Sequence, residues 1–182
     1  MIDITETPLE GLLLIRPKVF SDDRGYFFEP FNVAVFARAT GIHSPFVQDN
    51  ESRSKAGVLR GLHLQVAPHG QAKLVRVVTG AVMDVCVDVR PGSPTFGQHF
   101  SARLDAVDRD MLYIPAGFAH GFAALEDDTV FLYKCSSYYL PASERTILWN
   151  DPVLAINWGI DNPLVSAKDR AGSAFAERCW EK

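Results

Sequence analysis

Short apolar segments, bounded by proline, glycine and polar residues, recur at intervals of roughly ten residues along this chain. That rhythm is typical of an all-β sandwich or barrel. Expected strands include LLLIRP, YFFEPF, FVQDN, TFGQHFSARL, MLYIP and TVFLYKCSSYYL. Helix signals are few: Asn32 can cap a short helix through VAVFARAT, and SAFAERC near the end predicts another. The pattern predicts an all-β protein with a few short helices.

The stretch KLVRVVTGAVMDVCVDVR contains the clearest expected strand pair. Its valines from Val85 to Val89 alternate with Asp84, Cys86 and Asp88, and the TG dipeptide between the two apolar runs supplies a turn. We therefore expect the two runs to pair with each other. Many short antiparallel strands in a chain of this size predict a jelly roll, in which two sheets close around a cavity.

Length and charge limit the classes of protein that this chain can represent. A length of 182 residues suits one sizeable core, so residues 1–182 are expected to form a single domain. The 18 basic and 22 acidic residues give a net charge of −4, without the broad basic surface that nucleic-acid binding needs. No apolar run approaches a membrane span, and the start MIDITETPLE lacks a basic signal region, so we expect a cytoplasmic protein.

Several polar residues follow the order in which metal-binding cupins carry their ligands, namely His-x-His, a glutamate and a final histidine. The corresponding residues here are His63, Gln65, Lys73 and His120. Glutamine is a poor substitute for a histidine ligand, and a protonated lysine has no lone pair and repels a cation. A metal is therefore disfavoured. Together with Arg60, the cationic side chains suit a negatively charged substrate and a reaction that develops an oxyanion.

The period of two along a strand separates Arg60 from His63 in the segment RGLHLQ. It places His63 and Gln65 on one face and Arg60 on the other. Gly61 can resolve the conflict, because glycine permits a β-bulge that brings both side chains to one face. The sequence alone leaves His120 open between a pocket residue and a solvent-facing residue after a Pro-x-Gly turn.

Nine segments resemble the dTDP-4-dehydrorhamnose 3,5-epimerase family in order and spacing over nearly the whole chain. They are PKVFSDDRGYFFEPFN, FVQDNESRS, GVLRGLHLQ, QAKLVRVVTGAVMDVCVDVR, SPTFGQ, YIPAGFAHGF, FLYKCSSYYLP, ILWNDP and SAKD. The resemblance implies a cupin-type jelly roll, usually a homodimer, that needs neither metal nor dissociable cofactor. Its implied substrate is dTDP-4-dehydro-6-deoxyglucose, a dTDP-linked 4-keto-6-deoxy sugar inverted at carbons 3 and 5 on the pathway to dTDP-L-rhamnose.

The same resemblance implies roles for individual residues. The general base falls on His63, its supporting carboxylate on Asp169 and the acid on Tyr133. Lys73 matches a lysine near the sugar ketone oxygen, and His120 matches a second pocket histidine. Implied nucleotide contacts are Arg24, Glu29, Gln48, Asp49, Asn50, Arg60, Glu144 and Lys168, with Tyr139 stacking on thymine.

The chemistry of a 4-keto sugar explains why these residue types are needed. Carbons 3 and 5 both lie α to the ketone, so removal of either proton gives an enolate whose charge gathers on the ketone oxygen. A cation such as Lys73 stabilises that charge. A histidine titrates near neutral pH, as a base requires, and Asp169 can fix the tautomer of His63. Inversion returns the proton on the opposite face, a task for Tyr133.

Three alternatives remain open from the sequence. A metal-dependent cupin enzyme needs a further ligand at Gln65 or Lys73. A binding protein without catalysis keeps the nucleotide contacts but does not need the full catalytic set. A related epimerase that inverts carbon 3 alone is the third. Two departures from the family pattern are Leu64, which bears on pocket shape, and Gly159, which falls in a loop.

Overall fold

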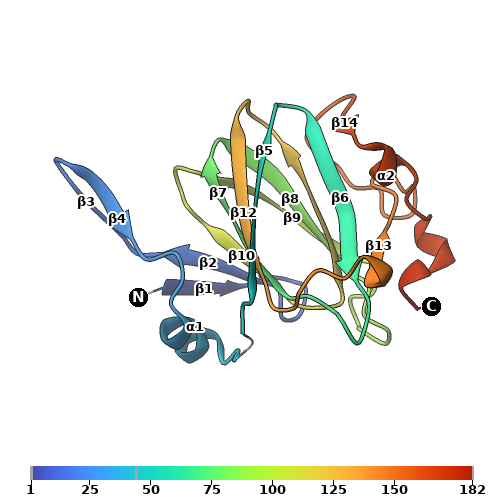
Figure 1. The fold of residues 1–182 in the computed structure, drawn as a ribbon, viewed down its shortest axis with the longest axis horizontal. Helices are drawn as coiled ribbons and strands as arrows, with labels where there is room; N and C mark the ends of the chain where they lie inside the picture. The colour runs from blue at the N-terminus through green and yellow to red at the C-terminus, as the bar shows by residue number, and fades with distance from the viewer. Residues whose placement is uncertain (1, 44, 182) are drawn as a thin grey trace.

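Two large sheets face each other in the computed structural model, which describes residues 2–43 and 45–181 (Figure 1). The first sheet contains, in spatial order, β1 (Ile2–Glu6), β2 (Leu13–Pro17), β10 (Met111–Ile114), β7 (Lys73–Thr79), β12 (Thr129–Cys135) and β5 (Gln48–Ser54). The second contains β13 (Glu144–Thr146), β6 (Val58–Gln65), β11 (Phe118–Ala124), β8 (Ala81–Asp88) and β9 (His99–Asp105), with β14 (Leu164–Val165) parallel to β6. The predicted all-β jelly roll is confirmed.

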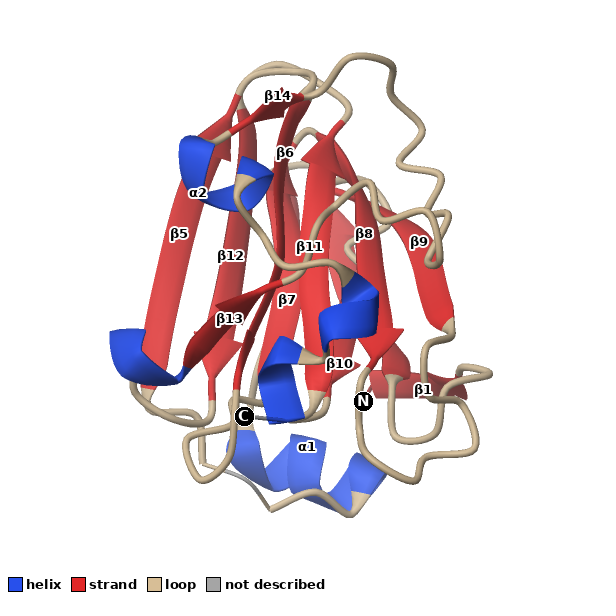
Figure 2. Cartoon of the chain, turned by 90° about the vertical axis from the view of Figure 1, so that its right-hand side faces the viewer, coloured by secondary structure: helices blue, strands red, loops and turns tan. Residues whose placement is uncertain are grey.

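Helices are short and lie outside the two sheets (Figure 2). Within the described residues they are α1 (Val33–Thr40), α2 (Ala167–Arg170) and three 3₁₀ turns, Pro141–Ser143, Phe175–Glu177 and Cys179–Glu181. Asn32 caps α1 as predicted, because its side chain accepts hydrogen bonds from the Ala34 and Val35 backbone N–H groups. The second predicted helix, SAFAERC, contains instead one 3₁₀ turn, with a second starting at its last residue, Cys179, and α2 was not predicted.

Apolar side chains fill the space between the sheets and also cover the outer face of the second sheet. Phe131 and Leu112 of the first sheet meet Phe118 and Cys86 of the second in one buried cluster. On the other side of β8, valine side chains such as Val87 pack against the carboxyl-terminal segments. The second sheet is therefore buried on both faces, which leaves its inward polar groups poorly exposed to water.

The expected pairing of the two runs in KLVRVVTGAVMDVCVDVR is wrong. β7 pairs with β10 and β12, whereas β8 pairs with β9 and β11, so the chain crosses from one sheet to the other between them. Gly80 makes this crossing with φ +77°, and a Cβ there would lie 2.4 Å from Thr129 Oγ1. The alternation reveals which residues share a face, but it does not reveal the partner strand.

Three predicted strands are shorter than expected, among them YFFEPF, which ends at Phe28. Thr95–Gln98 forms a turn before β9, since the Ser93 and Thr95 hydroxyls both donate to the buried Asp88 Oδ2 at 2.6 Å. The residues after Cys135, 136–140, leave the sheet as a loop. Side-chain hydrogen bonds of this kind compete with strand pairing, and they are not visible in an alternation pattern.

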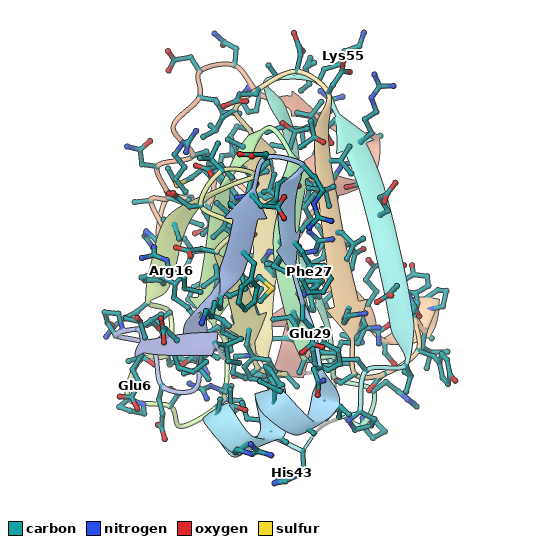
Figure 3. The ribbon with its side chains drawn as sticks, turned by 90° about the vertical axis from the view of Figure 1, so that its left-hand side faces the viewer. Glu6, Arg16, Phe27, Glu29, His43 and Lys55 are labelled. Carbon is teal, nitrogen blue, oxygen red and sulfur yellow. The ribbon has the colours of Figure 1, made fainter. Side chains whose placement is uncertain are left out.

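A two-stranded hairpin, β3 (Val19–Asp22) and β4 (Gly25–Phe28), projects away from both sheets (Figure 1). Its aromatic side chains Phe20, Tyr26 and Phe27 are 54%, 58% and 70% exposed. Phe27 lies on this arm and Glu29 at its base (Figure 3). Among the described residues, no helix is both long enough and apolar enough to cross a membrane.

Candidate active site

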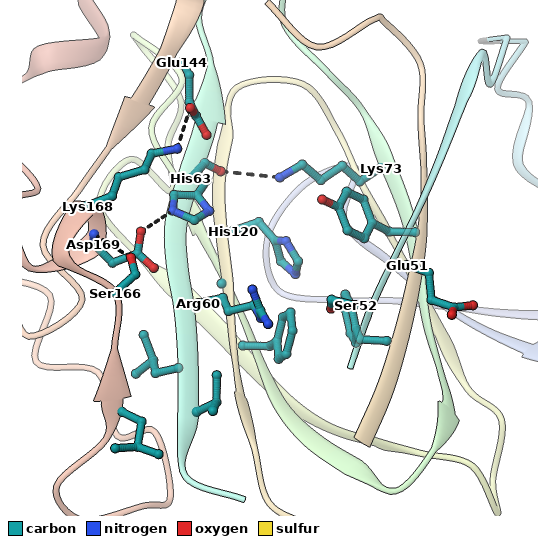
Figure 4. Close-up of a pocket in the computed structure, with 17 residues that line it drawn as sticks. Glu51, Ser52, Arg60, His63, Lys73, His120, Glu144, Ser166, Lys168 and Asp169 are labelled. Atoms are coloured by element: carbon teal, nitrogen blue, oxygen red, sulfur yellow. Dashed lines mark hydrogen bonds and ion pairs between the residues drawn. The ribbon is translucent and has the colours of Figure 1, made fainter. Parts of the chain in front are cut away.

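A cavity of about 540 Å³ lies between the two sheets, and residues of β5 in the first sheet and β6 in the second contribute to its lining. His63, Lys73, His120, Tyr133 and Asp169 all line it. Figure 4 shows His63 and Asp169 on one side of the cavity and Lys73 on the other. The four predicted catalytic residues, drawn from three strands and one helix, therefore meet at one place together with His120 of β11.

His63 and Asp169 form a hydrogen-bonded pair, with 2.6 Å between His63 Nε2 and Asp169 Oδ1. The Ser166 side chain caps α2 by accepting from the Asp169 N–H, and the Gly61 N–H donates to Asp169 Oδ2 at 3.3 Å. Burial alone would raise the pKa of Asp169, but the bonds from His63, Gly61 and Ser166 and the nearby His63 charge together lower it. An ionised Asp169 holds the proton on Nε2, which leaves Nδ1 as the basic nitrogen.

Arg60 reaches the same cavity as His63, as the predicted bulge requires. The register between β6 and β11 shifts between the pairs His120–His63 and Phe122–Arg60. Gly61 lies at the shift with φ +133°, and a Cβ there would lie 2.5 Å from the Gly121 Cα. Only glycine fits this close approach of two backbones. Arg60 Nε donates to Ser54 Oγ at 3.2 Å, which directs the guanidinium along the cavity wall.

Lys73 and His120 are buried cationic or potentially cationic groups on the inner walls. Lys73 Nζ lies 3.5 Å from the His63 carbonyl oxygen, and burial lowers the pKa of Lys73 despite nearby acidic groups that include Asp84. His120 Nε2 lies 2.9 Å from Asp84 Oδ2, and burial lowers the pKa of His120 more than Asp84 raises it. The solvent-facing interpretation of His120 is wrong. An anion bound beside Lys73 would restore the charge that burial disfavours.

Tyr133 projects from β12, where its Cα pairs with Val75 of β7 and Asn50 of β5. Burial raises the pKa of the Tyr133 phenol above its usual value. Tyr133 therefore keeps its proton at neutral pH and can donate it to a carbanion. The cavity therefore brings together a histidine paired with a carboxylate, a protonated phenol and a buried lysine, a set that suits proton abstraction and return α to a carbonyl.

A second lobe of about 290 Å³ adjoins the first and shares His63, Lys73, Tyr133 and Glu144 with it. Glu144 accepts hydrogen bonds from Tyr139 Oη at 2.8 Å and from Lys168 Nζ at 2.5 Å. Burial would raise the pKa of Glu144, but these two donors lower it. This lobe also contains the predicted contacts Gln48, Asn50 and Tyr139.

Three predicted substrate contacts lie away from both lobes. Asp49 points to the opposite face of β5, where its carboxylate pairs with Lys134 Nζ at 2.9 Å. Arg24 lies on the projecting hairpin and pairs with Asp22, and Glu29 lies at the base of that hairpin. The structure of one chain does not bring these three side chains to the cavity.

Gln65, which occupies a ligand position of metal-binding cupins, is committed to the backbone. Its amide donates to the His69 and Tyr138 carbonyl oxygens, and its Oε1 accepts from the Leu140 N–H at 2.6 Å. Within residues 2–43 and 45–181, no three His, Cys, Asp or Glu side chains converge as a metal site. The side chain of Leu64 belongs to the cluster on the outer face of the second sheet, and Leu64 also contributes to the lining of the second lobe.

Sequence reasoning missed several residues that shape the site. Asp84 was noted only for its place in an alternating strand, yet it supports His120. Ser166 precedes Asp169 by three residues, a capping pattern that could have revealed both α2 and its role. Ser52 lies two residues after Asn50, so the period of two could have placed it on the inner face of β5.

Comparisons with known proteins agree with this geometry. A family model described as dTDP-4-dehydrorhamnose 3,5-epimerase matches residues 6–177. A dTDP-4-dehydrorhamnose 3,5-epimerase of Pseudomonas aeruginosa is 52% identical over 174 residues, which cover 95% of this chain and 96% of the relative. A crystal structure of the Legionella pneumophila 3,5-epimerase in complex with dTDP-4-keto-L-rhamnose superposes with a TM-score of 0.93 at 44% identity, covering 98% of this chain and 97% of that one.

A further solved structure represents a different specificity. A 3′-monoepimerase from Streptomyces bikiniensis, in complex with dTDP-quinovose, has a TM-score of 0.89 and 40% identity, covering 93% of this chain and 86% of that one. The family match and the relatives with nearly equal length nonetheless agree on one description. This chain belongs to the dTDP-4-dehydrorhamnose 3,5-epimerase family.

Proposed function

We propose that this protein is a dTDP-4-dehydrorhamnose 3,5-epimerase, which converts dTDP-4-dehydro-6-deoxy-D-glucose to dTDP-4-dehydro-L-rhamnose for dTDP-L-rhamnose synthesis. The observation that carries the proposal is the His63–Asp169 pair, which shares one cavity with Lys73 and Tyr133. A binding protein would have no use for an oriented base, a buried cation and a protonated phenol together. The chain acts as one domain, and we place it in the cytoplasm because a charged nucleotide sugar does not cross membranes unaided.

The proposed reaction begins when His63 Nδ1 removes the proton from carbon 3 or carbon 5. The electron pair of the broken C–H bond moves into an enolate, whose oxygen lies against the Lys73 ammonium. Asp169 stabilises the imidazolium that forms on His63. Tyr133 then gives its proton to the opposite face of the same carbon, which inverts the centre. Solvent reprotonates Tyr133 and deprotonates His63 before the second carbon reacts.

Binding of the dTDP portion is assigned to the rim and the second lobe. Arg60 is proposed to hold the pyrophosphate through parallel N–H donors. Tyr139, which is 50% exposed, is proposed to stack on thymine. Gln48, Asn50, Glu144 and Lys168 supply the remaining polar contacts, and His120 with Lys73 faces the sugar.

We also propose a homodimer in which the projecting hairpin completes the site of a second copy. The hairpin exposes three aromatic side chains, although an isolated two-stranded hairpin is marginal in water. It carries Arg24, and Glu29 lies at its base, so two expected substrate contacts are held outside the cavity of their own chain. Docking on a partner would bury the aromatics and deliver both residues to the partner's cavity.

An assay coupled to an NADPH-dependent reductase that accepts only the L-rhamno product tests the activity. We expect NADPH to be consumed with the wild-type protein, and the rate to fall by at least 10²-fold in His63→Ala. Activity should survive dialysis against a chelator. Loss of activity that a divalent cation restores would favour the metal-dependent alternative, and a wild type without turnover would refute the proposal.

Mixing two inactive variants tests the shared site. If Arg24 acts in the partner's cavity, a heterodimer of Arg24→Ala and His63→Ala contains one site with both wild-type residues. Activity should then rise when the two variants are mixed and allowed to exchange subunits. Neither variant should gain activity when it is incubated alone. Mixtures that stay inactive despite proven subunit exchange would show that Arg24 does not act on a partner.

A further inference from the structure

One buried hydroxyl in the cavity has no protein partner. Among the described residues, two buried side-chain polar atoms lack a hydrogen bond, Ser52 Oγ and Trp180 Nε1. Of these two residues, Ser52 lines the cavity and Trp180 does not, and Figure 4 shows Ser52 across from Arg60 and His63. A buried hydroxyl without a partner is less stable than the same group hydrogen-bonded to water. Such a group at the wall of a substrate cavity is a candidate for a bond that forms only with substrate.

Ser52 differs from the other inward-facing residues of β5 in that its side chain has no hydrogen-bond partner. Inward-facing residues recur every second position on this strand, and the others have partners. Gln48 donates to Asn50, Asn50 donates to Cys135 Sγ at 3.6 Å, and Ser54 accepts from Arg60. Ser52 alone in this row is left without one. Its Cα pairs with that of Phe131, whose ring offers it no hydrogen bond.

The position of Ser52 along the strand indicates which part of the substrate it meets. Asn50 pairs in register with Tyr133, and Ser54 contacts Arg60, so Ser52 lies between the proposed proton donor and the proposed pyrophosphate anchor. A 4-keto sugar held with its ketone toward Lys73 and its phosphate toward Arg60 would place carbon 1 and its ring neighbours, carbon 2 and the ring oxygen, near that interval. Carbon 2 carries the one hydroxyl that is neither on a reacting carbon nor substituted.

We propose that Ser52 Oγ hydrogen-bonds the 2-hydroxyl of the sugar and thereby fixes how the ring is held against His63 and Tyr133. This inference rests on the proposed function and makes Ser52 a specificity-determining residue for that reaction. A hydroxyl is suited to the role because it both donates and accepts, as the 2-hydroxyl also does. Because Ser52 Oγ has no hydrogen bond within the protein, it can bind the 2-hydroxyl without breaking an existing contact.

The test compares Ser52→Ala with wild type on the natural substrate and on its 2-deoxy analogue. With the natural substrate, kcat/KM should fall about 3- to 10-fold, the effect of one neutral hydrogen bond. With the analogue, wild type and variant should differ less than about twofold, because neither can form the bond. The melting temperature of the variant should not fall, since no protein contact is lost. Ser101→Ala, at an exposed position on β9, is the matched control.

Each alternative outcome has a distinct meaning. Equal losses on both substrates, or a weaker affinity for dTDP itself, would place the Ser52 contact on the phosphate or ring oxygen and overturn the inference. An unchanged kcat/KM on the natural substrate would also overturn it. A wild type that turns over neither substrate would instead refute the proposed function, and the inference with it.

Discussion

His63 Nε2 and Asp169 Oδ1 lie 2.6 Å apart, although the two residues are 106 positions apart in the chain. The pair joins a central strand of the second sheet to α2, a helix of four residues. Because Asp169 occupies Nε2, Nδ1 is the nitrogen left for the proposed role of His63 as the base. The orientation of the base therefore depends on a short carboxyl-terminal segment that packs on the sheet, and not on the sheet alone.

Asp169→Asn should lower kcat by about 10²- to 10⁴-fold while leaving dTDP affinity unchanged. The amide is nearly the same size as the carboxylate, but it can favour the wrong tautomer of His63 and cannot stabilise the imidazolium. Steady-state kinetics with dTDP as a competitive inhibitor measures both quantities. Asp128→Asn, which removes an exposed partner of Arg53, is the matched control. A kcat within about tenfold of wild type would contradict the role of the pair.

Tyr133→Phe should separate exchange from inversion. The change is nearly isosteric and should cost less than about 1.5 kcal/mol of fold stability. His63 can still remove a proton and return it to the same face, so deuterium from solvent should enter carbon 3, carbon 5 or both without inversion. Mass spectrometry of the recovered nucleotide sugar detects the label, and NMR gives the configuration. Inversion at the wild-type rate would assign the acid to another group.

Lys73→Met should lose activity and gain stability at neutral pH. Burial lowers the pKa of Lys73 below 10.5, so the folded state binds this proton less tightly than the unfolded state. At pH values below the folded pKa, the protein is therefore less stable than it would be with a neutral side chain at this position. This loss of stability shrinks as the pH rises from the folded pKa toward 10.5. Thermal melts should show a higher melting temperature for the variant at pH 7 and a smaller difference at pH 10. A lower melting temperature at pH 7 would contradict this account.

Arg60→Lys should weaken dTDP binding by about 10- to 100-fold, since a lysine cannot replace two parallel guanidinium donors. Affinity for thymidine, which lacks phosphate, should stay the same. Calorimetry with both ligands measures the difference. Arg16→Lys removes a comparable two-point contact with Asp110 outside the cavity and should change neither affinity. An equal loss of affinity for dTDP and for thymidine would show that Arg60 does not bind the pyrophosphate.

Strand positions were predictable because side-chain alternation is a local property of the backbone, whereas strand partners were not. The valines around Val87 were recognised as one face of a strand, yet β8 pairs with β9 and β11 instead of its neighbour β7. The dipeptide Thr79-Gly80 indicates that the chain turns, but it does not indicate whether the two strands that it joins pair with each other. Here β7 and β8 belong to different sheets, and the outer face of the sheet with β8 is covered by distant segments that no local pattern reveals.

The residues that meet in the cavity were largely predictable, but the contacts that support them were not. The position of Arg60 beside His63 depends on Gly61 approaching Gly121 of another strand, and the sequence could only suggest that a bulge was possible. Asp84 supports His120 across two paired strands, a relationship that no local pattern encodes. Arg24 was expected at the substrate, and its position on the projecting hairpin shows that one chain does not deliver it to its own cavity.

Proton NMR of the product formed in deuterated water tests the central claim most directly, because it reports exchange and configuration at each carbon separately. If His63 and Tyr133 serve both centres, the wild-type protein should place deuterium at carbon 3 and carbon 5 and yield the L-rhamno configuration. His63→Ala should place deuterium at neither carbon. A product labelled and inverted at carbon 3 alone would contradict the account and assign the protein to the 3-epimerases instead.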